Sequence, residues 1–220
     1  MQKKTGILRV LTIDEDCLFD CTNQSLDLFP RIRSVEDYSD EKYLRKEWEN
    51  YYDHYEDSFQ LKLSPLFGTL LQALSHIGSM IGFNDLYRVD THDEALSVIQ
   101  KKFRGDEIYL VNFDQHHDQF IMHGVERVDC SNWASPQVMY REFKELDFYR
   151  YSWIPTSLTQ DFEFVKEYPR YHYSAEIIKD IDPLIRWCFY DAVIFCRSMA
   201  YVPSNYWEFF DDIFQKMIKE

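Results

Sequence analysis

The stretch EIYLVNFDQHHD, residues 107–118, decides how this 220-residue chain is interpreted. Its first seven residues form a short apolar run of the kind found in strands buried on both faces of a sheet. ILRVLTI (7–13) is a similar run near the start, and AVIFC (192–196) is a third near the end. The first two runs lead directly into acids, at Asp114 and at Asp14. Ligands of open parallel sheets bind beyond the carboxyl ends of the strands, so these acids mark the expected site.

Helical patterns fill the intervals between the apolar runs. We expect helices over residues 34–55, 65–81, 91–103, 136–146 and 203–219, and further strands over 125–129 and 148–153. Thr91 is the expected N-cap of the third helix, with Glu94 three residues later completing a capping box. Apolar strands that alternate with helices predict an α/β fold with a mostly parallel central sheet flanked by helices. No linker composition interrupts the chain, and we therefore expect residues 1–220 to form a single domain.

Composition excludes several classes of protein. The chain is 45% hydrophobic and 17% aromatic, with six glycines and seven prolines, which argues against disorder and against a repeat array. A formal net charge of -14 makes nucleic acid an unlikely partner and suits a cationic ligand such as a guanidinium or a basic peptide. Five cysteines without a C-x-x-C pair indicate a reducing compartment. Because no signal peptide and no membrane-length apolar run is present, we expect a cytoplasmic protein without a membrane partner.

Acids and histidines follow both of the first two apolar runs with a spacing of two. If the chain stays extended past the strand ends, residues i and i+2 share a face. Five side chains then converge, while Glu15, Gln115 and His117 point away; the converging set is Asp14, Asp16, Asp114, His116 and Asp118. Four acids at neighbouring strand ends repel one another unless a cation neutralises them. Asp-x-Asp alone is common in loops and at helix starts, but Asp-x-His-x-Asp directly after a buried strand is more specific. Carboxylates with imidazole suit Mn²⁺, and two ions can share bridging carboxylates.

Three of these segments resemble the arginase and agmatinase superfamily. VDTHDEAL (89–96) resembles the way arginases place their first metal-binding histidine, here His92. DQHHD (114–118) resembles the superfamily's Asp-x-His-x-Asp motif, and LTIDED (11–16) resembles its Asp-x-Asp motif. In ordinary arginases the Asp-x-Asp segment comes last, whereas here it comes first. That order, together with Asn132-Trp133, is similar to the family that contains peptide arginases of ribosomal-peptide maturation. The resemblance covers residues 7 to about 133, and more weakly 197–203.

This resemblance implies a three-layer arginase/deacetylase-like fold and a hydrolase with two Mn²⁺ ions. One ion would be held by His92, Asp114, Asp118 and Asp14, and the other by His116, Asp114, Asp14 and Asp16. A hydroxide bridging the two ions would attack the guanidinium carbon of arginine side chains in a precursor peptide, giving ornithine and urea, with Asp118 orienting the hydroxide. His123 is the candidate proton shuttle. Asn132, Trp133 and Arg197 are the candidate substrate contacts.

One position departs from the family pattern. Ordinary arginases hold the guanidinium with a glutamate near the end of a late strand, but this stretch has Cys196 and Arg197 instead. Arg197 either binds a carboxylate or carbonyl of the peptide or pairs with a structural acid. Two other functions stay open at this point: a two-metal phosphoesterase, and a regulatory protein that binds metal without turnover.

Overall fold

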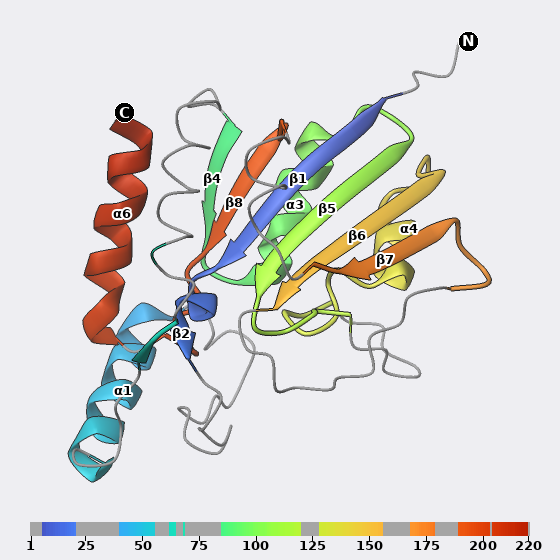
Figure 1. Ribbon diagram of the computed structural model, residues 1–220. Helices are drawn as coiled ribbons and strands as arrows, with labels where there is room; N and C mark the ends of the chain where they lie inside the picture. The colour runs from blue at the N-terminus through green and yellow to red at the C-terminus, as the bar shows by residue number, and fades with distance from the viewer. Residues whose placement is uncertain are drawn as a thin grey trace.

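A six-stranded sheet forms the centre of the computed structural model, which describes residues 6–20, 40–55, 62–64, 68, 85–119, 128–155, 168–178, 189–202 and 204–219. The strand order is β4-β8-β1-β5-β6-β7, and every pairing in this sheet is parallel (Figure 1). The strands are β1 (Ile7–Asp14), β4 (Leu86–Val89), β5 (Glu107–Asp114), β6 (Phe148–Pro155), β7 (Tyr173–Ile177) and β8 (Ala192–Cys196). A separate antiparallel pair joins β2 (Phe19–Asp20) to β3 (Lys62–Leu63). The expected parallel α/β sheet is therefore confirmed.

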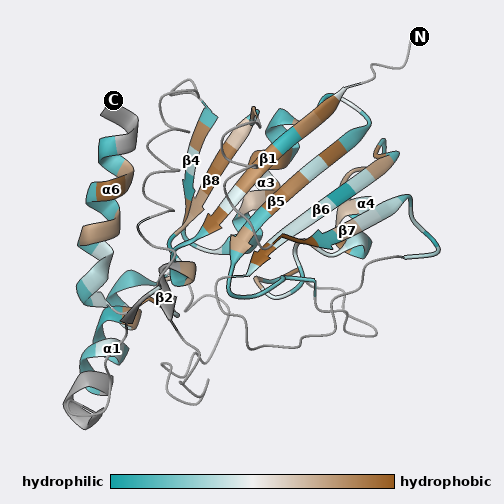
Figure 2. Ribbon diagram, in the orientation of Figure 1, coloured by the Kyte–Doolittle hydropathy of each residue, from teal (hydrophilic) through white to brown (hydrophobic). Residues whose placement is uncertain are grey.

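Successive side chains along a strand point to opposite faces of the sheet, and each face packs against its own layer of helices. Leu11 and Ile13 of β1 belong to a core cluster with residues of α1 (Glu41–Tyr55) and α6 (Trp207–Lys219). Val10 belongs to a second cluster with residues of α3 (Ala95–Lys102) and α4 (Pro136–Glu142). Figure 1 shows α3 and α4 together behind the sheet, and Figure 2 shows apolar residues recurring along its central strands. Helices on both faces of a central sheet give the three-layer arrangement.

Most of the expected elements are present with shifted ends, but the strand expected over 125–129 is not seen at its described residues. The strands expected at 7–13, 107–113, 148–153 and 192–196 are β1, β5, β6 and β8. The helix expected from residue 34 is seen from Glu41, and the one expected over 136–146 ends at Glu142. The closing helix begins with the 3-10 turn η6 (Ser204–Tyr206). Residues 34–39 and 125–127, and all of 65–81 except Gly68, lie outside the described residues, and Val128 and Asp129 are not in a strand.

The expected capping box at Thr91 is wrong in detail. Thr91 has the extended backbone of an N-cap, but its side chain makes no capping hydrogen bond. The carboxylate of Glu94 instead accepts a hydrogen bond from the backbone N–H of Asp90, at 2.9 Å. The helix starts with the 3-10 turn η5 (His92–Glu94) before α3 begins.

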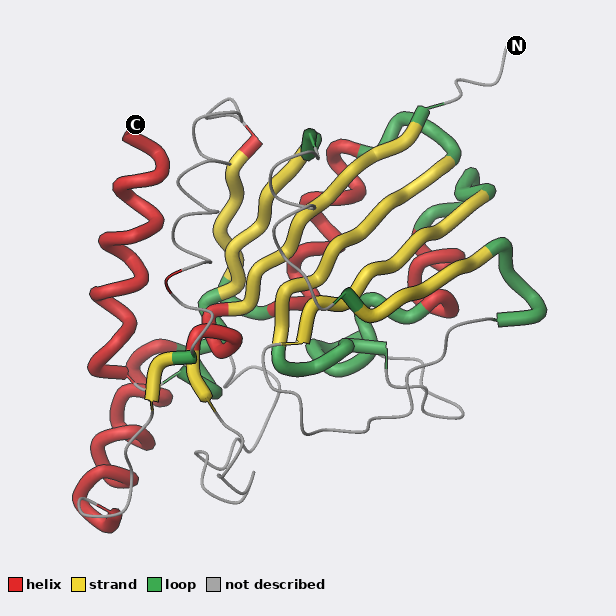
Figure 3. The backbone as a smooth tube through the Cα atoms, viewed as in Figure 1, coloured by secondary structure: helices red, strands yellow, loops and turns green. Residues whose placement is uncertain are grey.

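The strand order reverses direction between the neighbouring strands β1 and β5. After β1 the next strand of this sheet along the chain is β4, on one side, whereas after β5 the next is β6, on the other side (Figure 3). Neighbouring strands whose connections leave in opposite directions form a topological switch point, where open α/β sheets bind ligands. None of the described helices is long and apolar enough to cross a membrane.

Candidate metal centre

Sheet register brings the expected ligands to one edge. Ile13 of β1 pairs with Phe113 of β5, so Asp14 and Asp114 end neighbouring strands at the same level. Asp14 also pairs with Cys196 of β8, on its other side. The period of two puts these three residues on the face covered by α3 and α4, because they share the parity of core residues such as Val10. The turn that precedes α3 delivers His92 to the same place.

His92 stands at the centre of the first ligand group. Its Nδ1 lies 2.8 Å from Asp118 Oδ2, 3.1 Å from Asp114 Oδ2 and 3.3 Å from Asp14 Oδ2. The side chain is only 2% exposed, and neither ring nitrogen makes a hydrogen bond of normal geometry. A buried imidazole surrounded by three carboxylates, without a hydrogen bond of its own, fits the surroundings of a cation.

His116 forms the second group. Its Nδ1 lies 3.5 Å from Asp16 Oδ2 and 3.7 Å from Asp114 Oδ1, so Asp114 presents one oxygen to each histidine. Within each of two sets, the potential ligand atoms lie within 4.8 Å of one another: His92, Asp114 and Asp118, and Asp16, Asp114 and His116. These buried groups could hold a metal ion. All six expected ligands line one cavity of about 90 Å³, together with Cys130, Ser131, Ser198 and Tyr201.

Turns, rather than extended backbone, produce this convergence. Asp16 lies in the 3-10 turn η1 (Glu15–Leu18), and its N–H donates to Asp14 Oδ1 at 3.0 Å. The N–H of His116 donates to Asp114 Oδ1 at 2.9 Å in the same manner. Asp118 has a left-handed backbone, with φ of 49°. The expectation that the chain stays extended past the strand ends is therefore wrong, although the side chains meet as expected.

The three residues expected to point away do so. Glu15 is directed to Arg88, at 3.9 Å, and Gln115 Nε2 donates to the backbone carbonyl of Asp16. His117 Nδ1 accepts a hydrogen bond from the N–H of Gln119 at 3.0 Å, and its ring packs edge-on against Trp153. His117 therefore has a structural environment beside the ligands.

Three neighbouring side chains donate hydrogen bonds to the carboxylates around His92. Trp133 Nε1 donates to Asp118 Oδ2 at 2.6 Å, and its ring centroid lies 4.9 Å from that of His92. Ser198 Oγ donates to Asp14 Oδ2 at 2.5 Å. Asn112 Nδ2 donates to Asp114 Oδ2 at 3.3 Å. Each carboxylate around His92 thus has a hydrogen-bond donor of its own, the kind of support that orients metal ligands.

Backbone strain is concentrated at the same place. Among the described residues other than glycine, positive φ occurs at Asp118 and at Ser198, where φ is 42°. Such conformations cost on the order of 1–3 kcal/mol each and cluster at functional sites. One of these residues is an expected ligand and the other donates to a ligand, so the strain supports a functional role for this edge.

Burial and charge repulsion shift the titration of the cluster. Burial, reinforced by the negative charge of Asp114, raises the pKa of Asp118 to about 8. Burial also raises the pKa of Asp16, and the charge of Asp14 adds to the effect. Burial pushes the pKa of Asp114 in the same direction, but the neighbouring imidazoles of His116 and His92 outweigh it and hold that pKa well below its usual value. Two carboxylates no more than 4.8 Å apart repel by at least about 3.5 kcal/mol at an effective dielectric constant near 20. A divalent cation would remove this repulsion.

The expected substrate contacts are not at the cavity. Trp133 is fully buried and Asn132 is 4% exposed, its Oδ1 accepting from the N–H of Asp129 at 3.1 Å. Neither residue lines the described cavity, and Trp133 instead contacts Asp118 and His92. The guanidinium of Arg197 lies 3.4 Å from Glu41 and 3.5 Å from Asp90, which favours the structural alternative for this residue. His123 lies outside the described residues.

Four cavity residues were not among the expected site residues: Cys130, Ser131, Ser198 and Tyr201. Ser198 and Tyr201 follow β8, and their proximity depends on β8 lying next to β1. For Ser198 and Tyr201 the sequence offers one signal, the weaker resemblance at residues 197–203.

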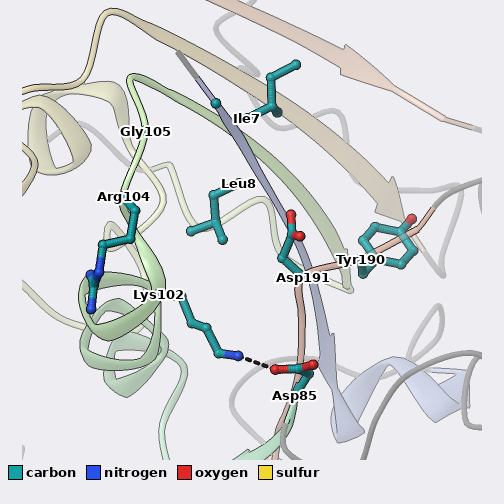
Figure 4. Close-up of a pocket in the computed structure, with 9 residues that line it drawn as sticks. Ile7, Leu8, Asp85, Lys102, Arg104, Gly105, Tyr190 and Asp191 are labelled. Atoms are coloured by element: carbon teal, nitrogen blue, oxygen red, sulfur yellow. Dashed lines mark hydrogen bonds and ion pairs between the residues drawn. The ribbon is translucent and has the colours of Figure 1, made fainter. Parts of the chain in front are cut away.

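A larger hollow of about 530 Å³ lies at the opposite end of the sheet (Figure 4). Its walls come from the amino end of β1, from the segments just before β4, β5 and β8, and from the end of α3, where Lys102 pairs with Asp85. Parallel sheets bind ligands at their carboxyl ends, and this hollow lacks the buried acids of the smaller cavity. The cluster of buried acids and histidines is therefore the better candidate site.

No protein-family model, curated protein or solved structure matches this chain. Its function must therefore be argued from its own residues and their geometry.

Proposed function

We propose that this chain is an arginase-like hydrolase that uses two Mn²⁺ ions to convert arginine side chains of a peptide to ornithine, releasing urea. The observation that carries the proposal is the pair of adjoining carboxylate–imidazole groups that share Asp114. Two such groups at a topological switch point support the resemblance of these segments to the ligand motifs of ureohydrolases.

The donor set fits divalent manganese. Its ligands are carboxylate oxygens and imidazole nitrogens, which suit Mn²⁺, and the raised pKa values of Asp16 and Asp118 show that the cluster favours added positive charge. Two ions bound there would act as Lewis acids and lower the pKa of a water molecule between them. Asp14 is the proposed second shared ligand, because its Oδ2 faces His92 while its Oδ1 accepts from the N–H of Asp16.

The protein side chains position the reactants. Asp118, held by Trp133, is placed to orient the attacking water. Water adds its oxygen to the guanidinium carbon, the bond from that carbon to the side-chain nitrogen breaks, and this nitrogen takes up the protons. The arginine cation and water thus become an ornithine cation and neutral urea, so atoms and charge balance.

Size and charge favour the end of a cationic side chain as the substrate. A cavity of about 90 Å³ admits a group the size of a guanidinium but not a folded peptide. The net charge of -14 attracts cations to the protein. Tyr201, whose ring centroid is 6.1 Å from that of His116, forms part of the wall that such a group would meet.

The test is mass spectrometry of an arginine-containing peptide incubated with the Mn²⁺-loaded protein. We expect each converted arginine to lose one CN₂H₂ unit, with an equal amount of urea released. Free arginine and a phosphate monoester run in parallel distinguish an ordinary arginase and a phosphoesterase. Bound manganese with no mass loss in any arginine compound would refute the proposal in favour of a binding protein.

Asp114→Asn is the matching inactive variant, and Glu15→Gln is its control. Glu15 lies between two proposed ligands in sequence but is directed to Arg88. Burial raises the pKa of Glu15, so a neutral amide of the same shape is a close substitute. We expect Glu15→Gln to retain activity and Asp114→Asn to lose it.

A further inference from the structure

Cys196 lies against the first ligand group, on a side that the manganese assignment does not use. It ends β8 and pairs in register with Asp14 of β1 on one side and with Val89 of β4 on the other. His92 follows β4 by three residues. Potential ligand atoms of Asp14, His92 and Cys196 all lie within 4.8 Å of one another, and Cys196 is fully buried.

His92 is common to two different ligand sets. One set adds the carboxylates of Asp114 and Asp118, and the other adds the Asp14 carboxylate and the Cys196 thiol. The ring nitrogens of His92 make no normal hydrogen bond, which is the independent sign that a cation belongs beside this imidazole. His92 therefore has carboxylate oxygens as its partners in one set, and a carboxylate oxygen and a thiol sulfur in the other.

We propose that Cys196 is a metal ligand for thiophilic divalent ions, and that Zn²⁺ or Co²⁺ binds to His92, Asp14 and Cys196 while Mn²⁺ binds to the carboxylate sets. This inference rests on the metal centre of the proposed function. Thiolates select Zn²⁺ over Mn²⁺, which prefers carboxylates. On binding, the thiol gives its proton to solvent and the sulfur bonds to the ion.

The geometry permits this coordination with small side-chain movements. Zinc bonds of about 2.3 Å to sulfur and about 2.0–2.1 Å to nitrogen and oxygen place tetrahedral ligand atoms roughly 3.3–3.6 Å apart. The ligand atoms lie within 4.8 Å of one another, at most about 1.5 Å beyond that spacing. Ser198 Oγ lies 3.4 Å from Cys196 Sγ and donates to Asp14, so the same serine contacts two members of the set.

The functional consequence is inhibition by zinc. An ion held by Asp14, His92 and Cys196 takes two residues that the proposed manganese centre needs. Zn²⁺ therefore displaces manganese from the His92 position, and removal of the thiol should relieve this inhibition.

Cobalt absorption spectroscopy of the full chain tests the coordination directly. Co²⁺ bound through Cys196 should show a thiolate-to-cobalt charge-transfer band in the near ultraviolet and the strong visible bands of tetrahedral cobalt. Cys196→Ser should lose the charge-transfer band. Cys17→Ser is the matched control, because Cys17 is equally buried and next to Asp16 but belongs to none of the ligand sets found among the described residues. Cys130→Ser controls for the cysteine that lines the cavity.

Calorimetry gives the size of the effect. We expect Cys196→Ser to bind Zn²⁺ at least about tenfold more weakly and to bind Mn²⁺ within about twofold of the wild type. Cobalt that binds the wild type without a charge-transfer band overturns this inference whether or not the variant folds, and leaves the manganese centre standing. A band lost in Cys130→Ser instead also overturns it. A protein that binds none of the three metals would refute the proposed function itself.

Discussion

Trp133→Phe tests whether the hydrogen bond to Asp118 shapes a metal centre. The substitution keeps an aromatic ring against His92 but removes the Nε1–H that donates to Asp118 Oδ2 at 2.6 Å. Hydrogen bonds to charged groups are worth about 1.5–3 kcal/mol, and loss of a residue that orients a metal ligand typically costs 10–100-fold in affinity. At about 1.4 kcal/mol per factor of ten, the two ranges agree. We therefore expect Mn²⁺ to bind Trp133→Phe about 10–100-fold more weakly.

Trp207→Phe provides the matched control for the smaller ring. Trp207 is as buried as Trp133, but its Nε1 donates to the backbone carbonyl of Val202, at 2.7 Å. Both variants lose packing and a hydrogen bond, which lowers the free energy of unfolding by roughly 1–3 kcal/mol in each. Calorimetric titration with Mn²⁺, beside thermal unfolding of the metal-free proteins, separates the two effects. Equal manganese affinity in the two variants would show that the Trp133 contact is ordinary core packing.

Two further predictions concern the occupied and the metal-free cluster. Asp114→Asn should reduce the manganese content of the protein from two ions to none, whereas His116→Asn should leave one, as measured by elemental analysis after dialysis; equal losses in the two variants would contradict the shared role of Asp114. In the metal-free protein, Asp118 has a folded-state pKa of about 8, above its unfolded value, so the stability that it contributes is lost as pH rises towards 8. The raised pKa values of His92 and His116 also make the folded protein less stable as pH rises above 6.5. The pKa of His117, lowered to about 4, makes the protein more stable as pH rises, but only below the unfolded value of 6.5. The melting temperature of chelator-treated protein should therefore fall from pH 6.5 to 8, and saturating Mn²⁺ should remove most of this slope; a melting temperature that rises over this interval would be inconsistent with the charge balance of the cluster.

The central strands could be predicted because their burial leaves a direct mark on composition. β1, β5 and β8 are covered on both faces, so most of their residues are apolar and form the runs visible in the sequence. β4 and β7 were not predicted, because strands at the edge of a sheet are less buried and carry no such mark. They are the two edge strands, and Leu86–Val89 and Tyr173–Ile177 include half-buried and polar residues that do not form an apolar run.

The proposed ligands could be predicted by their types and spacing, but the residues behind them could not. Trp133 was expected at the substrate mouth because a tryptophan near a site offers no sequence signal of which way it faces. Its position depends on the loop that brings Asp129 to Asn132 and Trp133, where backbone hydrogen bonds close a tight turn. Ser198 presented the same difficulty, since its contact with Asp14 spans 184 positions of the chain.

Strand order, rather than strand identity, brings the potential ligands together at this edge. His92 follows the edge strand β4, and β8 lies between β4 and β1. If β4 paired directly with β1, His92 would still be near Asp14, but Cys196 and Ser198, which end and follow β8, would not be at this site. The presence of β8 adds one strand spacing, about 4.8 Å, between β4 and β1. His92, in the 3-10 turn that follows β4, reaches back towards β1 despite this separation. His92 thereby comes within 3.3 Å of acids from both β1 and β5 while lying over the end of β8. The position of β8 thus accounts for the carboxylate sets proposed for manganese and for the thiol beside them.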